Sequence, residues 1–135
     1  MKIDLTEIRS IAESAFEGQT RRGGAPAIEH SKAVAAKVKG NELAEAVAWL
    51  HDVLEDTDVT AKDLLGRGVP KNVVTAVKTL TKPRWEPYEV YLERVKKDPL
   101  AAKVKVADML TNLGDDPTER QIKKYAHGLL YLLGY

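Results

Sequence analysis

The sequence has no cysteine among its 135 residues, so disulfides, thiolate zinc sites and a cysteine nucleophile are excluded. It also has no apolar run long enough to cross a bilayer and no apolar signal segment at its start. Its charge is nearly balanced, with 21 Lys and Arg against 20 Asp and Glu. No overall attraction to nucleic acid or to a membrane follows from that balance. We therefore expect a cytoplasmic protein without DNA, RNA or membrane partners.

Amphipathic helix patterns occupy most of the chain, with apolar residues spaced three and four apart. Alternating strand patterns, internal repeats and low-complexity segments are lacking. A chain of 135 residues is of ordinary size for one domain and can bury about two thirds of the surface that it exposes when unfolded. The sequence thus predicts one all-α domain, residues 1–135, folded as a bundle of about seven or eight helices.

Capping residues mark several expected helix ends. Asp4–Glu7 has the form of a capping box for a first helix that ends at Gly18. Thr60–Asp63 has the same form, and Asp98 precedes a proline at a first helical position. By the same logic, Asp116–Glu119 starts the last helix.

The stretch from Trp49 to Thr57 concentrates negative charge where a helix is expected to end. An amphipathic helix begins after Asn41, so Asp52, Glu55 and Asp56 are predicted at its C-terminus. A carboxylate there is unfavourable by ~0.3–1 kcal/mol because the helix dipole is negative at that end. Like charges three or four residues apart also repel. The pattern indicates that a positive charge supplied from elsewhere offsets this cluster.

A divalent cation would supply that charge. His51 and Asp52 offer an imidazole nitrogen and a carboxylate oxygen, a donor set that suits Mn, Fe or Zn. Two ligands do not make a site, and a solvated acidic helix end with a chance histidine is the alternative.

Further candidate ligands and binding residues lie elsewhere in the chain. A glycine-containing loop after the first helix holds Arg21 and Arg22, either as an anion-binding arm or as a solvated turn. His30 lies on the next helix, which a tight connection makes the antiparallel neighbour of the helix ending near His51. Asp108 interrupts an apolar helical segment, so it either reaches solvent or has a compensating partner.

The ordered set resembles the HD-domain metal-dependent phosphohydrolases, in particular the hydrolase domain of the RelA/SpoT group and the small stand-alone alarmone hydrolases. The likeness runs from about Ala15 to Leu113. It rests on four segments in the same order: Ala15–Gly24, the His-Asp-x-x-Glu-Asp-Thr segment from His51 to Thr57, Leu80-Thr81-Lys82, and the Lys-x-Ala-Asp-x-Leu-x-Asn segment from Lys105 to Asn112.

The resemblance implies an HD-type helical bundle in which four residues hold one divalent ion, usually Mn²⁺: His30, His51, Asp52 and Asp108. Glu55 and Asp56 match the pair that activates or orients the attacking water. The residues matching the substrate side are Arg21 or Arg22 at the base and Asn112 at the nucleoside end, and Lys105 matches a substrate-side or supporting lysine. The implied reaction is hydrolysis of the 3′-pyrophosphate of (p)ppGpp or a closely related nucleotide, by a domain acting without synthetase or regulatory domains.

Departures from the family pattern concern the substrate side. Ala27 replaces the usual tyrosine, Ser31 replaces a proline after the histidine, and Gly114-Asp115 replaces a basic residue and a threonine. Two alternatives therefore stay open beside (p)ppGpp hydrolysis. One is an HD phosphohydrolase acting on another nucleotide, and the other is a metal-stabilised helical binding module without catalysis.

Overall fold

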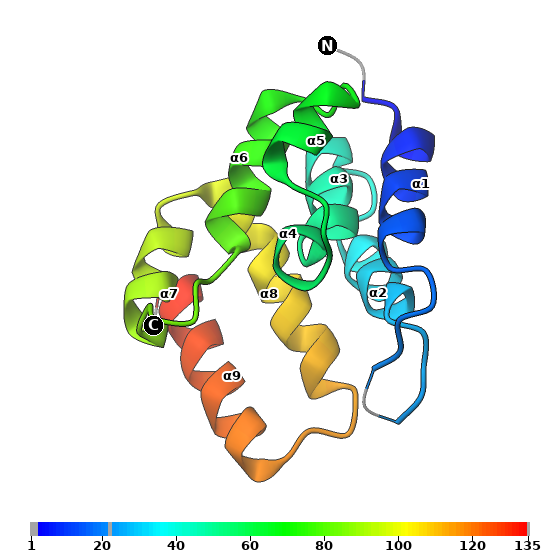
Figure 1. Ribbon diagram of the computed structural model, residues 1–135. Helices are drawn as coiled ribbons and strands as arrows, with labels where there is room; N and C mark the ends of the chain where they lie inside the picture. The colour runs from blue at the N-terminus through cyan, green and yellow to red at the C-terminus, as the bar shows by residue number, and fades with distance from the viewer. Residues whose placement is uncertain (1–2, 22, 135) are drawn as a thin grey trace.

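The computed structural model describes residues 3–21 and 23–134, which fold into nine α-helical segments without a β-strand (Figure 1). The segments are α1 Leu5–Ala15, α2 Ile28–Lys37, α3 Glu42–Leu50, α4 Val53–Asp56, α5 Ala61–Gly66, α6 Lys71–Leu80, α7 Tyr88–Lys96, α8 Pro99–Leu113 and α9 Glu119–Leu133. The all-α prediction is confirmed. None of the described helices combines the length and the apolar character that a membrane span requires.

Helices α3 and α8 form the centre of the bundle (Figure 1). Six of the nine residues of α3 are buried, from Ala44 to Leu50, and α1, α2, α6 and α8 pack around it. Helix α8 also contacts α2, α6, α7 and α9. Because α8 carries Asp108 and α3 ends beside His51, these two central helices bring distant candidate residues together.

The connection between α2 and α3 is a tight turn. Gly40 has a φ of +99°, a conformation that glycine adopts without strain. The Asn41 side chain then caps α3 by accepting a hydrogen bond from the Ala44 amide at 3.1 Å. The two helices pack against each other, and the rings of His30 and His51 lie with their centroids 5.3 Å apart.

The sequence led us to expect that the acidic stretch would form the C-terminal end of α3. In the structure it lies outside that helix. Helix α3 ends at Leu50, and Asp52 has φ −102° and ψ 0°, outside the helical region. The chain then makes the single turn α4, in which the Asp56 amide donates to the Asp52 carbonyl at 2.9 Å. His51 Nδ1 lies 2.6 Å from the Ala48 carbonyl oxygen, so the imidazole hydrogen-bonds to one of the last carbonyl groups of α3. This break turns Asp52 toward the candidate metal ligands.

Three of the expected helix starts, at Asp4, Thr60 and Asp98, are confirmed and one is shifted. Thr60 and Asp63 form a reciprocal capping box, and Asp98 caps α8 ahead of its first-turn proline. The last helix begins after Thr118, which forms a capping box with Gln121, whereas Asp116 has a φ of +46° and lies before the cap. Thr118 takes the capping position because its hydroxyl accepts from the Gln121 amide at 3.1 Å and its own amide donates to the Gln121 side chain at 2.9 Å.

The first helix is shorter than predicted. It ends at Ala15, and the chain turns at Gly18 with a φ of +80°. The Asp4 carboxylate accepts from the Glu7 amide at 3.1 Å, which is half of a capping box. The Glu7 carboxylate pairs with Arg67, the residue that follows α5, so it ties α1 to the end of α5.

Helix α9 approaches the rest of the bundle closely at Gly128. A Cβ atom at this position would lie 2.8 Å from Met109 Sδ and 3.1 Å from Tyr88 Oη. The missing side chain therefore lets α9 pack on α8 and α7. This packing places Lys124, one turn earlier, over the Tyr88 ring at 4.6 Å.

Candidate metal centre and substrate cavity

Four side chains from α2, the α3–α4 junction and α8 converge on one point. His30 Nε2 lies 2.7 Å from Asp108 Oδ1 and 4.0 Å from Asp52 Oδ2. His51 Nε2 lies 3.1 Å from Asp52 Oδ2 and 3.4 Å from Asp108 Oδ1. Atoms arranged around one ion at about 2.0–2.2 Å would have separations of this order. The structure thus brings together all four residues that the sequence analysis named as metal ligands.

The orientation of His51 fits a metal ligand. Its Nδ1 faces the Ala48 carbonyl, which can only accept, so Nδ1 carries a proton and Nε2 of the neutral ring has a free lone pair. This Nε2 is buried and has no hydrogen-bond partner among the described residues. A ring held by a backbone carbonyl, with its other nitrogen directed at carboxylates, is the usual arrangement of a metal-binding histidine. The donor set of two imidazoles and two carboxylates therefore fits a divalent ion.

The electrostatics of the centre show the same requirement for positive charge. Burial alone would lower the pKa of His51, but Asp52 and Asp108 outweigh burial and raise it well above its ordinary value. Burial would raise the pKa of Asp108, whereas Lys105 and the two histidines hold it well below its ordinary value. A bound cation would compete with the proton of His51, so metal affinity should rise with pH.

Lys105 lies beside the metal centre. Its Nζ donates to Asp108 Oδ2 at 2.9 Å, and only 16% of its side chain is exposed. Burial would lower the pKa of Lys105, but Asp108 and Tyr91 raise it, so the group is a fixed cation. Asp108 thus offers one oxygen to the centre and the other to Lys105. The lysine expected in a substrate-side or supporting role thus contacts a candidate ligand, and it also lines the adjoining cavity.

Glu55 and Asp56 are neighbours on α4, and only Glu55 lines the cavity beside the metal centre. Glu55 lines a cavity of about 130 Å³ together with His51, Asp52 and Asp108. Its Oε1 accepts a hydrogen bond from the Lys82 amide at 2.9 Å. Asp56 lines a neighbouring hollow and keeps its carboxylate within 4.8 Å of those of Asp52 and Glu55.

The cavity is also lined by basic and aromatic residues, which we call its basic wall. Lys82, Tyr88 and Lys124 belong to this wall, and each comes from a different segment. Partial burial and the nearby Lys105 and Lys82 lower the pKa of Lys124. Repulsion between these cations would be relieved by an anion in the cavity. The cavity therefore has one side suited to a cation and another suited to an anion.

A second hollow, of about 490 Å³, contains the other predicted substrate residues. Arg21 Nη2 lies 3.4 Å from Asn112 Oδ1, and both residues line it with Tyr125 and Asp115. Arg22 lies outside the described residues. Asp115, one of the departures from the family pattern, lines this hollow and adds a negative charge to it. Of the other departures, Ser31 is fully buried and cannot contact a ligand on the surface.

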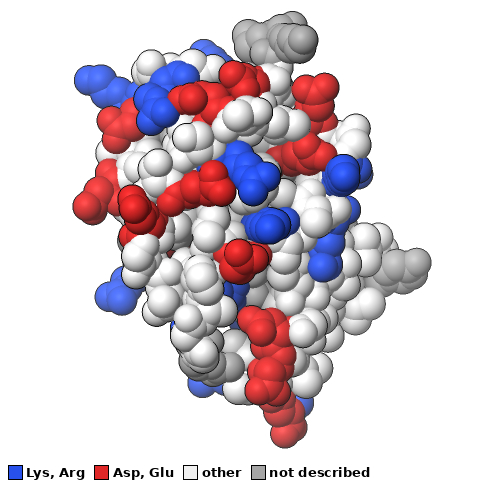
Figure 2. Space-filling model, turned by 90° about the vertical axis from the view of Figure 1, so that its right-hand side faces the viewer, with Lys and Arg blue, Asp and Glu red and all other residues white. Residues whose placement is uncertain are grey.

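Charged side chains of both signs are interspersed over much of the face formed by the early helices (Figure 2). A broad field of one sign is not seen on that face.

Comparison with known proteins links this geometry to a family. The chain is 36% identical over 118 residues to the bifunctional (p)ppGpp synthase/hydrolase SpoT of Escherichia coli strain K12, covering 82% of this chain and 17% of that protein. It is 32% identical over 108 residues to a probable guanosine-3′,5′-bis(diphosphate) 3′-pyrophosphohydrolase of Synechocystis, covering 70% and 14%. A solved structure, described as a metazoan ortholog of SpoT that hydrolyzes ppGpp, superposes with a TM-score of 0.81 at 25% identity, covering 99% of this chain and 88% of that one.

The chain belongs to the SpoT-like family of HD-domain proteins. It spans less than a fifth of the length of these curated relatives. No protein-family model matches it. The match to the solved structure covers nearly the whole chain, so the SpoT-like domain has the helical HD-domain fold.

Sequence reasoning missed three residues of this SpoT-like site. Lys82 belongs to the Leu80-Thr81-Lys82 segment of the family resemblance but was assigned no role, and Tyr88 and Lys124 had no local signal. Each lies on a different element, so only the packing of α6, α7 and α9 brings them to one cavity. Tyr125 was noted for its aromatic area alone, and the fold places it beside Arg21 and Asn112.

Replacing Asp56 with asparagine should stabilise the metal-free protein above pH 6. Partial burial, Asp52 and Glu55 raise the pKa of Asp56 from 3.8 to about 6. The native state thus binds more protons than the unfolded state between these values, and its stability falls as pH rises through that window. Because the side chain is exposed, we expect a gain of only about 1 kcal/mol at pH 7 and little change below pH 4.

Urea unfolding at pH 4 and pH 7 checks this expectation. Added Mn²⁺ should reduce the gain at pH 7, because a cation at Asp52 offsets the same repulsion. An equal change in stability at both pH values would contradict the assigned cause.

Proposed function

We propose that residues 1–135 form one phosphohydrolase domain that hydrolyses the 3′-pyrophosphate of (p)ppGpp or a close analogue, with one Mn²⁺ ion, in the cytoplasm. The observation that carries this proposal is the pairing of two features in one cavity. A cluster of two histidines and two carboxylates borders a cavity, and the same cavity is lined by Glu55, Lys82 and Lys124. The named activities of the SpoT relatives support the same reaction.

The metal would be held by His30, His51, Asp52 and Asp108. When bound, a divalent ion lowers the pKa of a coordinated water and offsets charge that develops on a phosphoryl group. Mn²⁺ suits the mixed nitrogen and oxygen donors.

Glu55 is the residue placed to take the proton from the attacking water. It lines the cavity beside His51 and Asp52. Its Oε1 accepts from the Lys82 amide, which leaves Oε2 as the oxygen that would take the proton. A positioned carboxylate of this kind contributes roughly 10²–10⁴-fold to the rate. Asp56, with its pKa of about 6, is the adjacent group to which that proton can pass.

The substrate would lie across both hollows. Lys82 and Lys124 face the phosphates, and their positive charge favours the departing pyrophosphate. Arg21, Arg22 and Asn112 would bind the nucleoside end, with the planar guanidinium suited to stacking on a base. Lys105 acts indirectly, because it fixes the Asp108 carboxylate.

Another nucleotide is the second candidate substrate, and Asp115 is the observation that favours it. A carboxylate in the hollow of Arg21 and Asn112 reduces its attraction for additional phosphates on the nucleoside. A nucleoside monophosphate carries fewer charges and tolerates that change better.

Product analysis tests the proposal. The Mn²⁺-loaded protein is incubated with guanosine 3′,5′-bis(diphosphate) and, separately, with nucleoside monophosphates. Release of pyrophosphate and guanosine 5′-diphosphate supports the proposed reaction. Release of orthophosphate from a monophosphate alone supports the second candidate. Bound Mn²⁺ without turnover of any of these substrates would instead support a non-catalytic binding module.

A further inference from the structure

We propose that Arg94, paired with Glu86, is a positioning residue for Glu55 and acts through the peptide bond between Thr81 and Lys82. The inference rests on the proposed function, because it assigns Arg94 to the catalytic role of Glu55. Arg94 lies on α7 and does not line the cavity.

The peptide unit between Thr81 and Lys82 is hydrogen-bonded on both sides. Its N–H donates to Glu55 Oε1 at 2.9 Å, and its carbonyl accepts from Arg94 Nη2 at 3.4 Å. Hydrogen bonds on the two sides of one amide polarise each other and fix its plane. The position of the Glu55 carboxylate is thus linked to the Arg94 guanidinium through three covalent bonds of the backbone.

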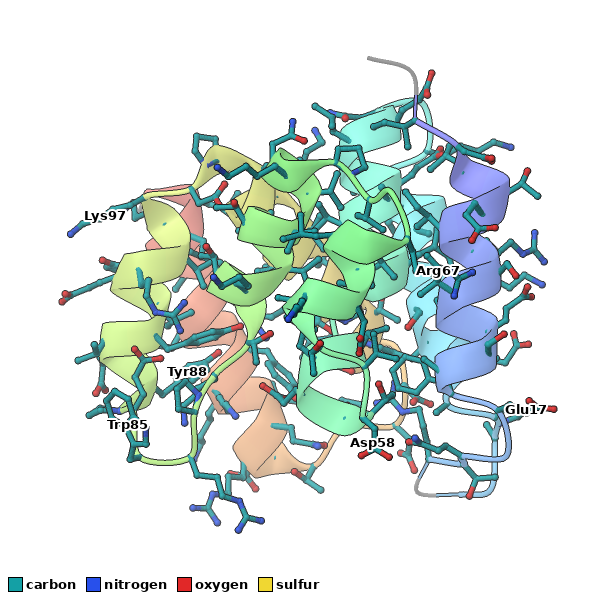
Figure 3. The ribbon with its side chains drawn as sticks, turned by 45° about the horizontal axis from the view of Figure 1, so that its top comes forward. Glu17, Asp58, Arg67, Trp85, Tyr88 and Lys97 are labelled. Atoms are coloured by element: carbon teal, nitrogen blue, oxygen red, sulfur yellow. The ribbon has the colours of Figure 1, made fainter. Side chains whose placement is uncertain are left out.

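The segment that carries this peptide has no regular structure of its own. It connects α6, which ends at Leu80, with α7, which starts at Tyr88. Trp85 in this connection is 81% exposed and lies at the outer edge of the molecule (Figure 3). The connection therefore depends on contacts with its neighbours for a fixed conformation.

Side chains of α7 supply these contacts. The last carbonyl groups of a helix have no hydrogen-bond donors within that helix. At the end of α6, side chains of α7 donate to three consecutive carbonyl oxygens. Arg94 Nη1 donates to the Thr79 carbonyl at 2.6 Å, and the Tyr91 hydroxyl donates to the Leu80 carbonyl at 2.7 Å. The Thr81 carbonyl is the third. One guanidinium thus holds the peptides on both sides of the end of α6.

Glu86 fixes the guanidinium in turn. Its two carboxylate oxygens accept from Arg94 Nη2 at 2.7 Å and from Nε at 3.2 Å. Glu86 is 7% exposed, and the hydrogen bonds from Arg94 hold its pKa below the ordinary value. A bidentate pair of this kind specifies orientation as well as charge. Lysine has the charge of arginine but not the fork that reaches two carbonyls and a carboxylate.

The test is a double-mutant cycle between Arg94 and Glu55. Arg94→Lys should lower kcat by roughly 10- to 100-fold, as expected for a misplaced catalytic group, with KM and Mn²⁺ affinity changed less than about twofold. In a Glu55→Ala background the same substitution should have no further effect on kcat. Losses that multiply in the double variant, or a parallel loss of Mn²⁺ affinity, would overturn the inference.

A matched arginine gives the control. Arg67 follows α5 and pairs with a glutamate of α1, Glu7, whereas the carbonyls of Thr79 and Thr81 are bonded by Arg94. Arg67→Lys should leave kcat unchanged. An equal fall in kcat for this variant would show that loss of any interhelical pair is sufficient, and would overturn the specific role of Arg94.

A second readout does not depend on turnover. Amide hydrogen exchange at Lys82 should be slow in the wild-type protein and roughly tenfold faster in both Arg94→Lys and Glu55→Ala. Unchanged exchange in the Arg94 variant would overturn the link. If the wild-type protein hydrolyses none of the nucleotides and Lys82 exchange responds as expected, the proposed function fails while the link between Arg94 and Glu55 is supported.

Discussion

Replacing Asp108 with asparagine will remove Mn²⁺ binding and destabilise the protein at the same time. One carboxylate oxygen lies 2.7 Å from His30 Nε2, and the other accepts from Lys105 at 2.9 Å. The substitution removes a ligand and leaves a buried cation without its partner. Breaking a buried pair in this way costs about 3–5 kcal/mol. We expect metal affinity to fall at least about 100-fold. Loss of a group that only hydrogen-bonds to a metal ligand already lowers affinity 10- to 100-fold.

The two effects of Asp108 can be separated with a second substitution. Lys105→Met retains the length of the side chain and removes the buried charge. The double variant Lys105→Met with Asp108→Asn should regain most of the lost stability but none of the metal affinity. Calorimetric titration with Mn²⁺ and urea unfolding measure the two quantities. Recovery of metal binding in the double variant would exclude Asp108 as a ligand.

Replacing Glu55 with glutamine will lower turnover by roughly 10²–10⁴-fold while Mn²⁺ affinity stays within about threefold. The amide oxygen of glutamine still accepts from the Lys82 N–H, so the side chain retains its position. What it loses is the ability to take a proton. Stopped-flow or steady-state assays with saturating Mn²⁺ give kcat, and full turnover in the variant would contradict the assigned role.

Asp58 offers a matched control for Glu55. It lies at the same acidic end, is exposed, and does not line the cavity that contains His51 (Figure 3). Asp58→Asn removes the same unit of charge, so it should reproduce any effect that comes only from the local field. We expect kcat to change by less than about twofold, because exposed charges are screened by solvent. A similar loss in both variants would mean that net charge, and not proton transfer, explains the effect.

The helices were predictable because local signals specify them. The capping residues Thr60 and Asp98 act within three positions of the chain, and the structure confirms both. The break after Leu50 was missed because His51 competes for the Ala48 carbonyl, a contact that no apolar spacing reveals. Asp116 was mistaken for a cap because it precedes a proline, although Thr118 has the better partner in Gln121.

The metal centre could be proposed from the sequence because the resemblance orders its residues, and the structure brings His30, His51, Asp52 and Asp108 together. Their role as ligands stays a prediction. The basic wall could not be derived, since Lys82 and Lys124 meet only through packing of α6 and α9 around α7 and α8. For Lys105 the sequence left a substrate-side and a supporting role open, because spacing along a helix does not show which neighbour a long side chain reaches; in the fold Lys105 lines the cavity and also donates to Asp108.

The central claim is that one divalent ion at the His51 centre makes this SpoT-like domain a pyrophosphohydrolase. The most direct measurement is turnover of guanosine 3′,5′-bis(diphosphate) by metal-stripped protein as Mn²⁺ is added in known amounts. We expect no pyrophosphate without metal, and release that rises with added Mn²⁺ and saturates at one bound ion per chain. Full release by the metal-stripped protein, or no release when one ion is bound, would contradict the account.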